Sequence, residues 1–446
     1  MRQLKSIQFM VMALGGFFLS DVYANSSKLY SLSDTEMSET TGQALMSLTY
    51  ISPKDTLNLE SQRTGLSNPS SGGVGFYKLG LEGVLELNAN IKKLQLGCGG
   101  MNGAGACDID IDYLSLSGIS ETSTGRASSS AKLTNPFTEI AIRNPNSAST
   151  REVLGFRVSS EKAEGLLTFG LENGSAKSGI NSLSGYMEVA ATSGIAKVNP
   201  INGLKPSDVN GQQISGEACG LIICLPFTTT DYTLNLRNSS GSSTAPLLGN
   251  LTLPQQVITG KRISVAPLKA NATVSGIQVS GNIKAVAAGI INLDKATTGT
   301  VNNLKVDVSI SEDLGYFHRA NLNGTPASLS LQATDILWPG TKSLAQRGWW
   351  LEFSNPIDIG DVSPTDAVNI ASNTIEATLV QISDYLTNEE KVKCGAAGLL
   401  SCLGGSTINI GTPDLSNAPA VPMALTNLVL ANQSFAPNCY GTLKFC

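Results

Sequence analysis

The sequence contains few of the side chains on which catalysis and nucleic-acid binding commonly depend. Charged residues make up only 15% of the 446 residues, whereas soluble domains usually contain about 25%. The 30 basic residues are outnumbered by 35 acidic ones, so we expect no basic surface for nucleic acid or anionic lipid. With His318 as its single histidine, the chain can hold only one histidine-dependent site. It also lacks the G-x-S-x-G motif of serine hydrolases.

The first 24 residues have the organisation of a secretion signal. Arg2 and Lys5 precede an uncharged, mostly apolar run over residues 7–18, and the segment ends in the small-x-small pattern at Ala24. The apolar run is too short to cross a bilayer, which takes about 20 residues. We therefore expect export and cleavage after Ala24. Because no cysteine precedes Cys98, a lipid-attachment cysteine at the mature N-terminus is excluded.

The eight cysteines form four local pairs along the sequence. An even number of cysteines behind a secretion signal predicts disulfides, and pairing between neighbours is the simplest of about 105 possible schemes. A zinc site is the alternative, but only one pair approaches zinc-ligand spacing and histidine is scarce. Each short link should stabilise the fold by about 2 to 3 kcal/mol. The expected pairs are Cys98 with Cys107, Cys219 with Cys224, Cys394 with Cys402, and Cys439 with Cys446.

Apolar and polar residues alternate over much of the chain. Segments 84–92 and 305–310 have the period of a half-buried strand, and clusters of Gly, Ser and Asn separate such segments. The pattern predicts a mainly β protein with large antiparallel sheets, arranged as a sandwich or as a curved extended sheet. Helical spacing of Ile375, Leu379, Ile382 and Leu386 predicts one amphipathic helix over 373–388 that covers a sheet face. We expect a β region at 51–200, a second at 201–362, and the helix with disulfide-closed loops at 363–446.

The stretch SLSDTEMSETTGQAL, at residues 31–45, raises a separate question. Ser33 and Glu36 form a capping box that predicts a short helix within the N-terminal region 25–50. Its residues also match the spacing of double-glycine leader peptides, with Gln43 in place of the second glycine. This resemblance implies docking on a C39-type cysteine peptidase-like partner. In the alternative interpretation the segment covers the first sheet and buries Leu45, Met46 and Leu48. The matching positions are Leu32, Glu36, Met37, Thr40 and Gly42.

A longer resemblance begins at Phe76. The stretch FYKLGLEGVLELNANIKKLQLGCGGMNGAGACDIDIDYLSLSGIS is followed by LTNPF and by NSASTREVLGFRVSSEKAEGLLTFG. Over residues 31–189 the chain resembles the FilA-type proteins assigned to a pilus system in certain Gram-negative bacteria. The resemblance implies assembly at the cell surface and no known reaction. It also agrees with the leader-like segment, because that system includes a C39-family peptidase.

Three carboxylates recur at every second residue in CDIDIDY. On a strand, Asp108, Asp110 and Asp112 share one face about 6.5 to 7 Å apart. The pattern is similar to the start of a calcium loop, although the sixth position is Tyr113 instead of glycine and the twelfth lacks glutamate. We favour a solvated strand face balanced by Lys92 and Lys93, and a calcium site is the alternative.

Three further features have two interpretations each. His318 is a general base or a structural histidine, and we favour the structural role. Trp338, Trp349 and Trp350 fill a core or bind a partner or glycan, and we favour the core. The apolar residues 221–223 inside the Cys219 to Cys224 loop insert into a neighbouring subunit or cap the core.

Export, paired cysteines, low charge and polar strand faces together favour a structural or adhesive component of a cell-surface assembly, without catalysis. We expect other assembly subunits as partners, no cofactor apart from the calcium alternative, and a location in the periplasm, outer membrane or cell surface. An outer-membrane β-barrel is one alternative function, although aromatic residues are only 6% and clustered, not arranged in girdles. A secreted carbohydrate-active enzyme is the other, since two acidic residues suffice for its chemistry.

Overall fold

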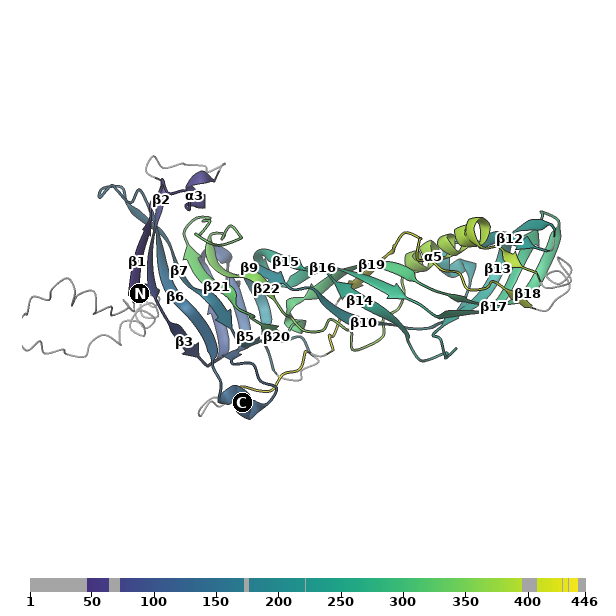
Figure 1. Ribbon diagram of the computed structural model, residues 1–446, viewed down its shortest axis with the longest axis horizontal. Coiled ribbons are helices and arrows are strands. Elements are labelled where there is room, and N and C mark those ends of the chain that lie inside the picture. Colours follow the sequence, from purple (N-terminus) through teal and green to yellow (C-terminus); the bar gives the residue numbers. More distant parts are fainter. Residues whose placement is uncertain are drawn as a thin grey trace, which may run out of the picture. The chain divides into compact units, whose positions relative to one another are not determined.

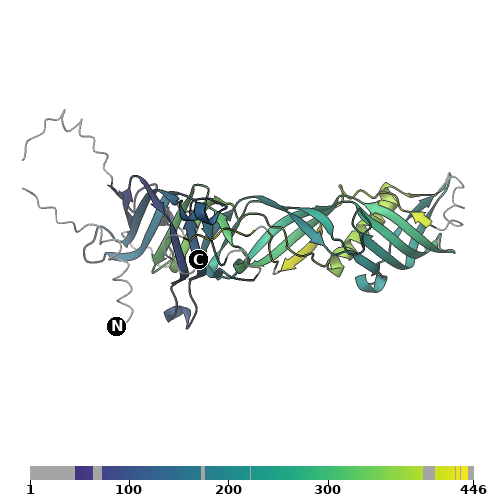
Figure 2. The ribbon, with the colours of Figure 1, turned by 90° about the horizontal axis from the view of Figure 1, so that it is seen from below.

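Three β-sheets make up most of the part of the chain that the structure describes, as Figure 1 and Figure 2 show. The structure is a computed structural model. It describes residues 46–63, 73–171, 176–220, 222–394, 407–426, 428–431 and 433–439. The expected signal peptide and leader-like segment lie outside these residues, as do Cys402 and Cys446. Residues Met46–Cys446 belong to one compact unit. The mainly β class predicted from the alternation is confirmed.

The largest sheet has 13 strands within the described residues. Its pairings are antiparallel except for β22 beside β9. Strands from residues 46 to 357 meet in it, so segments from two of the expected regions share one sheet. The order is β1 (Met46–Ile51), β2 (Val74–Leu81), β6 (Ala131–Arg143), β7 (Glu152–Glu164), β21 (Thr325–Gln332), β22 (Gly348–Ile357), β9 (Ile180–Val189), β5 (Ile109–Ser117), β8 (Leu166–Thr168) and β20 (Arg319–Asn321), with β15 (Gln256–Ile263) on β9, β3 (Val84–Leu87) on β6 and β4 (Ala89–Leu96) on β5.

In the two smaller sheets, buried and exposed side chains alternate along the strands with a period close to two residues. In β19 every second side chain from Leu304 to Ile310 is buried, which confirms the half-buried strand expected at 305–310. The five-stranded sheet is β10 (Thr192–Val198), β14 (Leu247–Leu253), β16 (Val265–Val274), β19 (Leu304–Asp313) and β25 (Val421–Thr426). The seven-stranded sheet is β23 (Val392–Lys393), β12 (Ser215–Cys219), β13 (Cys224–Arg237), β17 (Ile277–Ala287), β18 (Ile291–Val301) and β24 (Thr407–Asn409), with β11 (Ile201–Leu204) on β13.

The prediction of a single strand over residues 84–92 is wrong. The chain breaks at Asn88 into β3 and β4, and the side chains of β3 are all exposed. The side-chain amide of Asn88 donates to the carbonyls of Arg126 and Ser129. These bonds tie the break to α4 (Ser123–Ala127), so the alternation continues in sequence while the pairing partner changes.

The amphipathic helix is confirmed as α5 (Ser372–Asp384), which continues into a π-helical turn, η4 (Tyr385–Glu389). Its expected apolar residues Ile375, Leu379, Ile382 and Leu386 are all buried. Ile375, Leu379 and Ile382 border an apolar cavity of about 70 Å³, which strand residues such as Val198, Leu236 and Val306 also line. Among the described residues the other helical elements are short: α3 (Leu59–Gln62), α4, η1 (Gly100–Asn102), η2 (Pro206–Val209) and η3 (Leu314–Tyr316).

Two apolar clusters form the core. The larger one takes residues from all three sheets and from α5. The smaller one joins Phe76 on β2 to Trp338 and Trp350, both of which are buried. The core interpretation of these two tryptophans is therefore confirmed, and Trp349 is half-buried against the larger cluster.

The disulfides agree with the prediction in part. Cys98 is bonded to Cys107 and Cys219 to Cys224. Cys394 is also disulfide-bonded. Cys439 carries a free thiol, so its expected link to Cys446 is wrong. Strand pairing sets Cys219 directly opposite Cys224, whereas residues 433–439 are in no assigned strand and no ladder positions Cys439 for a bond.

Candidate interaction surface

One face of the large sheet carries apolar side chains in two cross-strand rows. In the first row Tyr50, Tyr77, Ile140, Phe156 and Leu331 stand opposite one another on β1, β2, β6, β7 and β21. Residues directly opposite in an antiparallel pair lie close enough for their side chains to touch. The rings of Tyr50 and Tyr77 accordingly stack, with centroids 4.5 Å apart. The row is therefore one continuous apolar strip.

The second row runs beside the first, two residues along each strand. It consists of Leu48, Leu79, Thr138, Val158 and Leu329. Neither row contains a charged residue. Thr138, half-buried on β6, is the one polar member between apolar neighbours.

Tyr77, Thr138 and Leu329 are half-buried, and eight apolar side chains in or beside the rows are open to solvent. Leu48 is 74% exposed and Val153, opposite Ile142, is 62% exposed, while the other six lie between 38% and 43%. Monomeric soluble proteins seldom expose so many contiguous apolar side chains, and such patches usually mark interaction sites. We call this set the apolar face: Leu48, Tyr50, Leu79, Ile140, Val153, Phe156, Val158 and Leu331.

The opposite face of the same strands is covered in part and combines apolar core residues with a buried ion pair. Glu139 on β6 and Arg157 on β7 point to that side, and both are buried. Arg157 donates to the Glu139 carboxylate and to the carbonyl of Pro339. Its guanidinium also lies over the rings of Phe137 and Trp338. Burial raises the pKa of Glu139 and lowers that of Arg157. The segment that covers this side includes Trp338 and Ala345 of the smaller core.

The apolar face continues into the larger core. Along β22, Leu351 and Phe353 project on the same side as the two rows, because they pair with Leu329 and Ala327. Phe353 is buried and stands beside Met187 on β9, which is buried as well. On this side of the sheet, the strands from β22 onward therefore pack in the larger core, whereas the strands from β7 to β1 are uncovered.

Strand β1 adds an open edge to this face. It is the last strand of the sheet and, among the described residues, pairs only with β2. Unpaired backbone groups on an edge strand favour pairing with another chain. The expectation that Met46 and Leu48 would be buried is wrong, since they are 47% and 74% exposed. No described element packs over them, and Leu45 lies outside the described residues.

The three aspartates of the alternative calcium site have protein partners. The Asp108 carboxylate is buried and accepts the backbone N–H of Trp349 and the Asn102 side-chain amide. Lys93 on β4 lies between the other two, with its Nζ 2.6 Å from Asp110 and 2.9 Å from Asp112. The expected balance by Lys93 is thus present. Within the described chain the three carboxylates do not converge into a group that could hold an ion.

The ionisation of Asp110 reflects this pairing. Burial opposes its charged form, but hydrogen bonds from Lys93, Gln95 and Asn181 outweigh burial and lower the pKa of Asp110. A carboxylate stabilised in this way has its charge already offset by Lys93. The strand face balanced by Lys93 therefore describes Asp110 and Asp112, whereas Asp108 is buried and not solvated as expected.

His318 is buried between segments of the chain. Its Nδ1 lies 3.1 Å from the carbonyl oxygen of Phe169, and its backbone N–H donates to Gln433. Burial lowers the pKa of His318, so the ring is neutral at pH 7. These contacts are those of a structural histidine that anchors the C-terminal segment.

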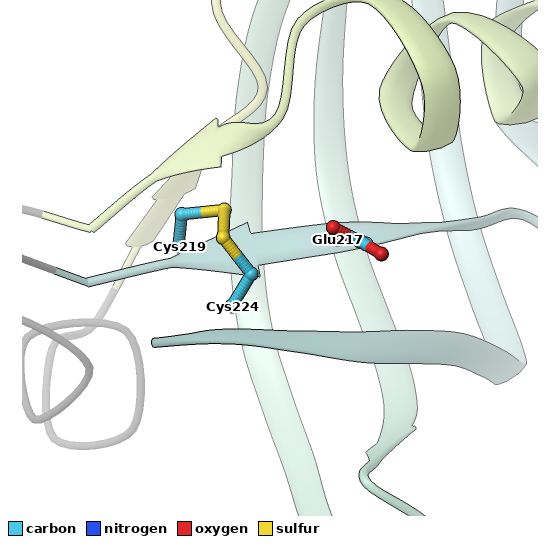
Figure 3. A group of neighbouring side chains, drawn as sticks. All are labelled: Glu217, Cys219 and Cys224. Carbon is cyan, nitrogen blue, oxygen red and sulfur yellow. A yellow bond between two sulfur atoms is a disulfide. The ribbon is translucent and has the colours of Figure 1, made fainter. Parts of the chain in front are cut away.

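The described residues contain one cluster with metal-ligand atoms in reach of one another, formed by Glu217, Cys219 and Cys224 (Figure 3). Both sulfurs are already bonded to each other, so neither is a thiolate ligand. Glu217 pairs with Lys391 at 2.5 Å. In the loop between the cysteines, Ile222 is almost fully exposed, so the core-capping interpretation of this residue is wrong.

Sequence reasoning missed the apolar face, although its signal is present. Positions 48 and 50, 77 and 79, 140 and 142, and 156 and 158 are apolar at the period of a strand. That period identifies a strand with an apolar side. It does not reveal whether anything covers that side.

Comparisons of the chain with protein-family models, curated proteins and solved structures found no match. No helix among the described residues is both long and apolar enough to cross a membrane. The observed disulfides are typical of proteins in an oxidising compartment.

Proposed function

We propose that the chain is an exported structural or adhesive subunit of a bacterial cell-surface assembly. It contacts neighbouring subunits through the apolar face and the open edge of β1, and it performs no catalysis. The observation that carries this proposal is the charge-free pair of rows that runs across β1, β2, β6, β7 and β21 in continuity with the core. Exposing such an apolar face to water is unfavourable in free energy, and a partner that covers the face removes this penalty.

Three further observations support the proposal. The N-terminal sequence has the features of an export signal, and disulfides form in the compartments that such signals lead to. The resemblance over residues 31–189 concerns proteins of a surface assembly. The single histidine is held in a structural role, and Asp110 and Asp112 are balanced by Lys93.

The leader-like segment provides a second contact in the same proposal. A C39-type peptidase-like partner recognises Leu32, Glu36, Met37 and Gly42 as a docked helix. Strand β1 begins at Met46, so a cut after Gln43 removes nothing from the described sheets. Processing at this position is therefore compatible with the fold.

Cell fractionation tests the proposal. The gene is expressed with its own N-terminal segment in a Gram-negative host, and intact cells are treated with protease before an immunoblot. We expect the chain to be degraded in intact cells while a periplasmic marker survives, and cross-linking to give species larger than the monomer. A chain that stays intact in whole cells and fractionates as an uncross-linked periplasmic monomer contradicts the proposal.

A further inference from the structure

We infer that the partner that covers the apolar face is a second copy of this chain, packed sheet to sheet about a two-fold axis. This inference rests on the proposed function, because it names the partner of the same surface. It predicts a symmetric dimer in which β1, β2, β6 and β7 of one copy lie against the same strands of the other.

The size of the apolar face fits such a contact. If each member presents about 150 Å², the lower end of the range for aromatic residues because six of the eight are aliphatic, the exposed fractions leave on the order of 600 Å² open to solvent. A standard stable interface buries about 800 Å² on each partner. The apolar side chains alone thus approach the area that one side of a stable dimer needs.

The chemistry of the face also suits a copy of itself. A two-fold contact brings identical patches together, so any charge near its centre would meet a like charge. The two rows contain none. Sheets pack about 10 Å apart when apolar side chains interdigitate, with strands inclined by about 30°, and the two parallel strips of side chains provide the ridges for this packing.

The chain's own N-terminal residues are a poorer cover. Between the expected cleavage point and β1, residues 25–45 contain five large apolar side chains, at Leu29, Tyr30, Leu32, Met37 and Leu45. Leu29 and Leu32 lie three residues apart, but Ser33 and Glu36 occupy the next positions of that repeat, so any apolar side of a helix here is short. The same stretch carries Lys28, Asp34, Glu36 and Glu39, whose burial against a charge-free face would be costly.

Substitutions of Thr138 can be chosen either to strengthen or to weaken the inferred dimer. It lies in the second row between Leu79 and Val158, so its side chain would be buried at the contact. Thr138→Val removes the only polar group from that row and should tighten the dimer about tenfold, because two hydroxyls leave the interface. Thr138→Glu places two like charges near the axis and should weaken it by about 100-fold or more.

The experiment is sedimentation equilibrium on the exported full chain from about 0.1 to 100 µM, extended to nanomolar concentrations by fluorescence detection, because interfaces of this size have dissociation constants from micromolar to picomolar. The control is Leu248→Glu on β14, where the leucine is 56% exposed but lies outside the large sheet. Circular dichroism and the melting temperature establish that each variant is folded. Should Thr138→Glu unfold, Val153→Glu replaces it, since Val153 is more exposed.

We expect a wild-type dimer, a tighter Thr138→Val dimer, a monomeric Thr138→Glu variant and a control that dimerises like the wild type. A monomeric wild type throughout the range overturns the inference, whether residues 25–45 or another subunit covers the face. A dimer that Thr138→Glu leaves unchanged overturns it too, because the contact then lies elsewhere. The proposed function is judged separately by protease accessibility on cells, so a surface-exposed monomer refutes the dimer alone.

Discussion

Arg157 on β7 lies directly opposite Glu139 on β6, and the two form an ion pair with an N to O distance of 2.5 Å that is closed to solvent on both sides. The same two strands carry a second pair, Arg143 with Glu152, at 2.7 Å and largely in water. The two pairs differ mainly in burial, so they form a matched comparison on one ladder.

Removing Glu139 should therefore be far more damaging than removing Glu152. Glu139→Ala leaves the Arg157 charge buried without its carboxylate, which should lower the free energy of unfolding by about 3 to 5 kcal/mol. Glu152→Ala removes an exposed pair and should cost less than about 1 kcal/mol. Urea denaturation of both variants measures the difference. Equal losses would show that the buried pair contributes no more to stability than the exposed one.

A second prediction concerns Glu312, which is buried at the end of β19. Its carboxylate accepts the backbone N–H groups of Leu428 and Asp313 at 3.0 and 3.1 Å. Burial nevertheless raises the pKa of Glu312 to about 7. The folded protein thus binds this proton more tightly than the unfolded chain, and the resulting stability is full below about pH 4.5 and is lost as the pH rises through 7.

Glu312→Gln should remove this pH dependence. The amide resembles the neutral acid and keeps an acceptor for Leu428, so at pH 8 the variant should exceed the wild type in stability by at most about 3 kcal/mol. Near pH 4 the two should be nearly equal. Glu121→Gln is the control, since the Glu121 side chain is 71% exposed. Thermal melts from pH 4 to 8 measure the melting temperature of each protein. If the melting temperatures of the wild type and Glu312→Gln change with pH in parallel, the prediction is contradicted.

The helix α5 allows a third comparison, between adjacent residues. Leu379 is buried and borders the apolar cavity, while Val380 is 49% exposed. Leu379→Ala enlarges a cavity that already exists and should lower the free energy of unfolding by about 3 to 5 kcal/mol. Val380→Ala should change it by less than about 0.5 kcal/mol. Guanidinium denaturation distinguishes the two, and a small effect of Leu379→Ala would mean that the helix contributes little to the core.

Local patterns predicted the elements that depend on local sequence. The helical spacing of Ile375, Leu379 and Ile382 gave α5, and strict alternation gave β19, because in both cases one side of the element is packed along its whole length. The break at Asn88 escaped prediction. Its cause is a pair of hydrogen bonds to carbonyls about 40 residues away in sequence, which no periodicity encodes.

The candidate surface depends even more on distant residues. Phe156 and Arg157 are neighbours on β7, yet the charged side chain is buried and the aromatic one is half exposed. The reason is the segment around Trp338 and Pro339, which covers the Arg157 side from about 180 residues away. Alternation assigns Phe156 and Arg157 to opposite sides of the sheet, but the choice of the covered side is made by tertiary contacts.

The last prediction concerns Gly42 in the leader-like segment. If a C39-type peptidase-like partner docks on this segment, the two residues before the cut, Gly42 and Gln43, must pass through a narrow active site, where a β-branched side chain at position 42 does not fit. Gly42→Val should then block docking or processing. The melting temperature should stay nearly unchanged, because β1 begins only at Met46. Ser38→Ala is the control, since Ser38 lies in the same segment but at none of the positions that match the leader pattern.

N-terminal sequencing of the surface form reads out the result. Processing after Gln43 gives a mature chain that begins at Ala44 in the wild type and in Ser38→Ala, and at Asn25 in Gly42→Val. Docking without a cut gives Asn25 throughout, together with a partner that is captured by the wild type and lost with Gly42→Val. Asn25 in every variant with no captured partner would discard the recognition role. In the alternative, in which this segment covers the first sheet, a lowered melting temperature of Gly42→Val would show that residues 25–45 contribute to the stability of that sheet.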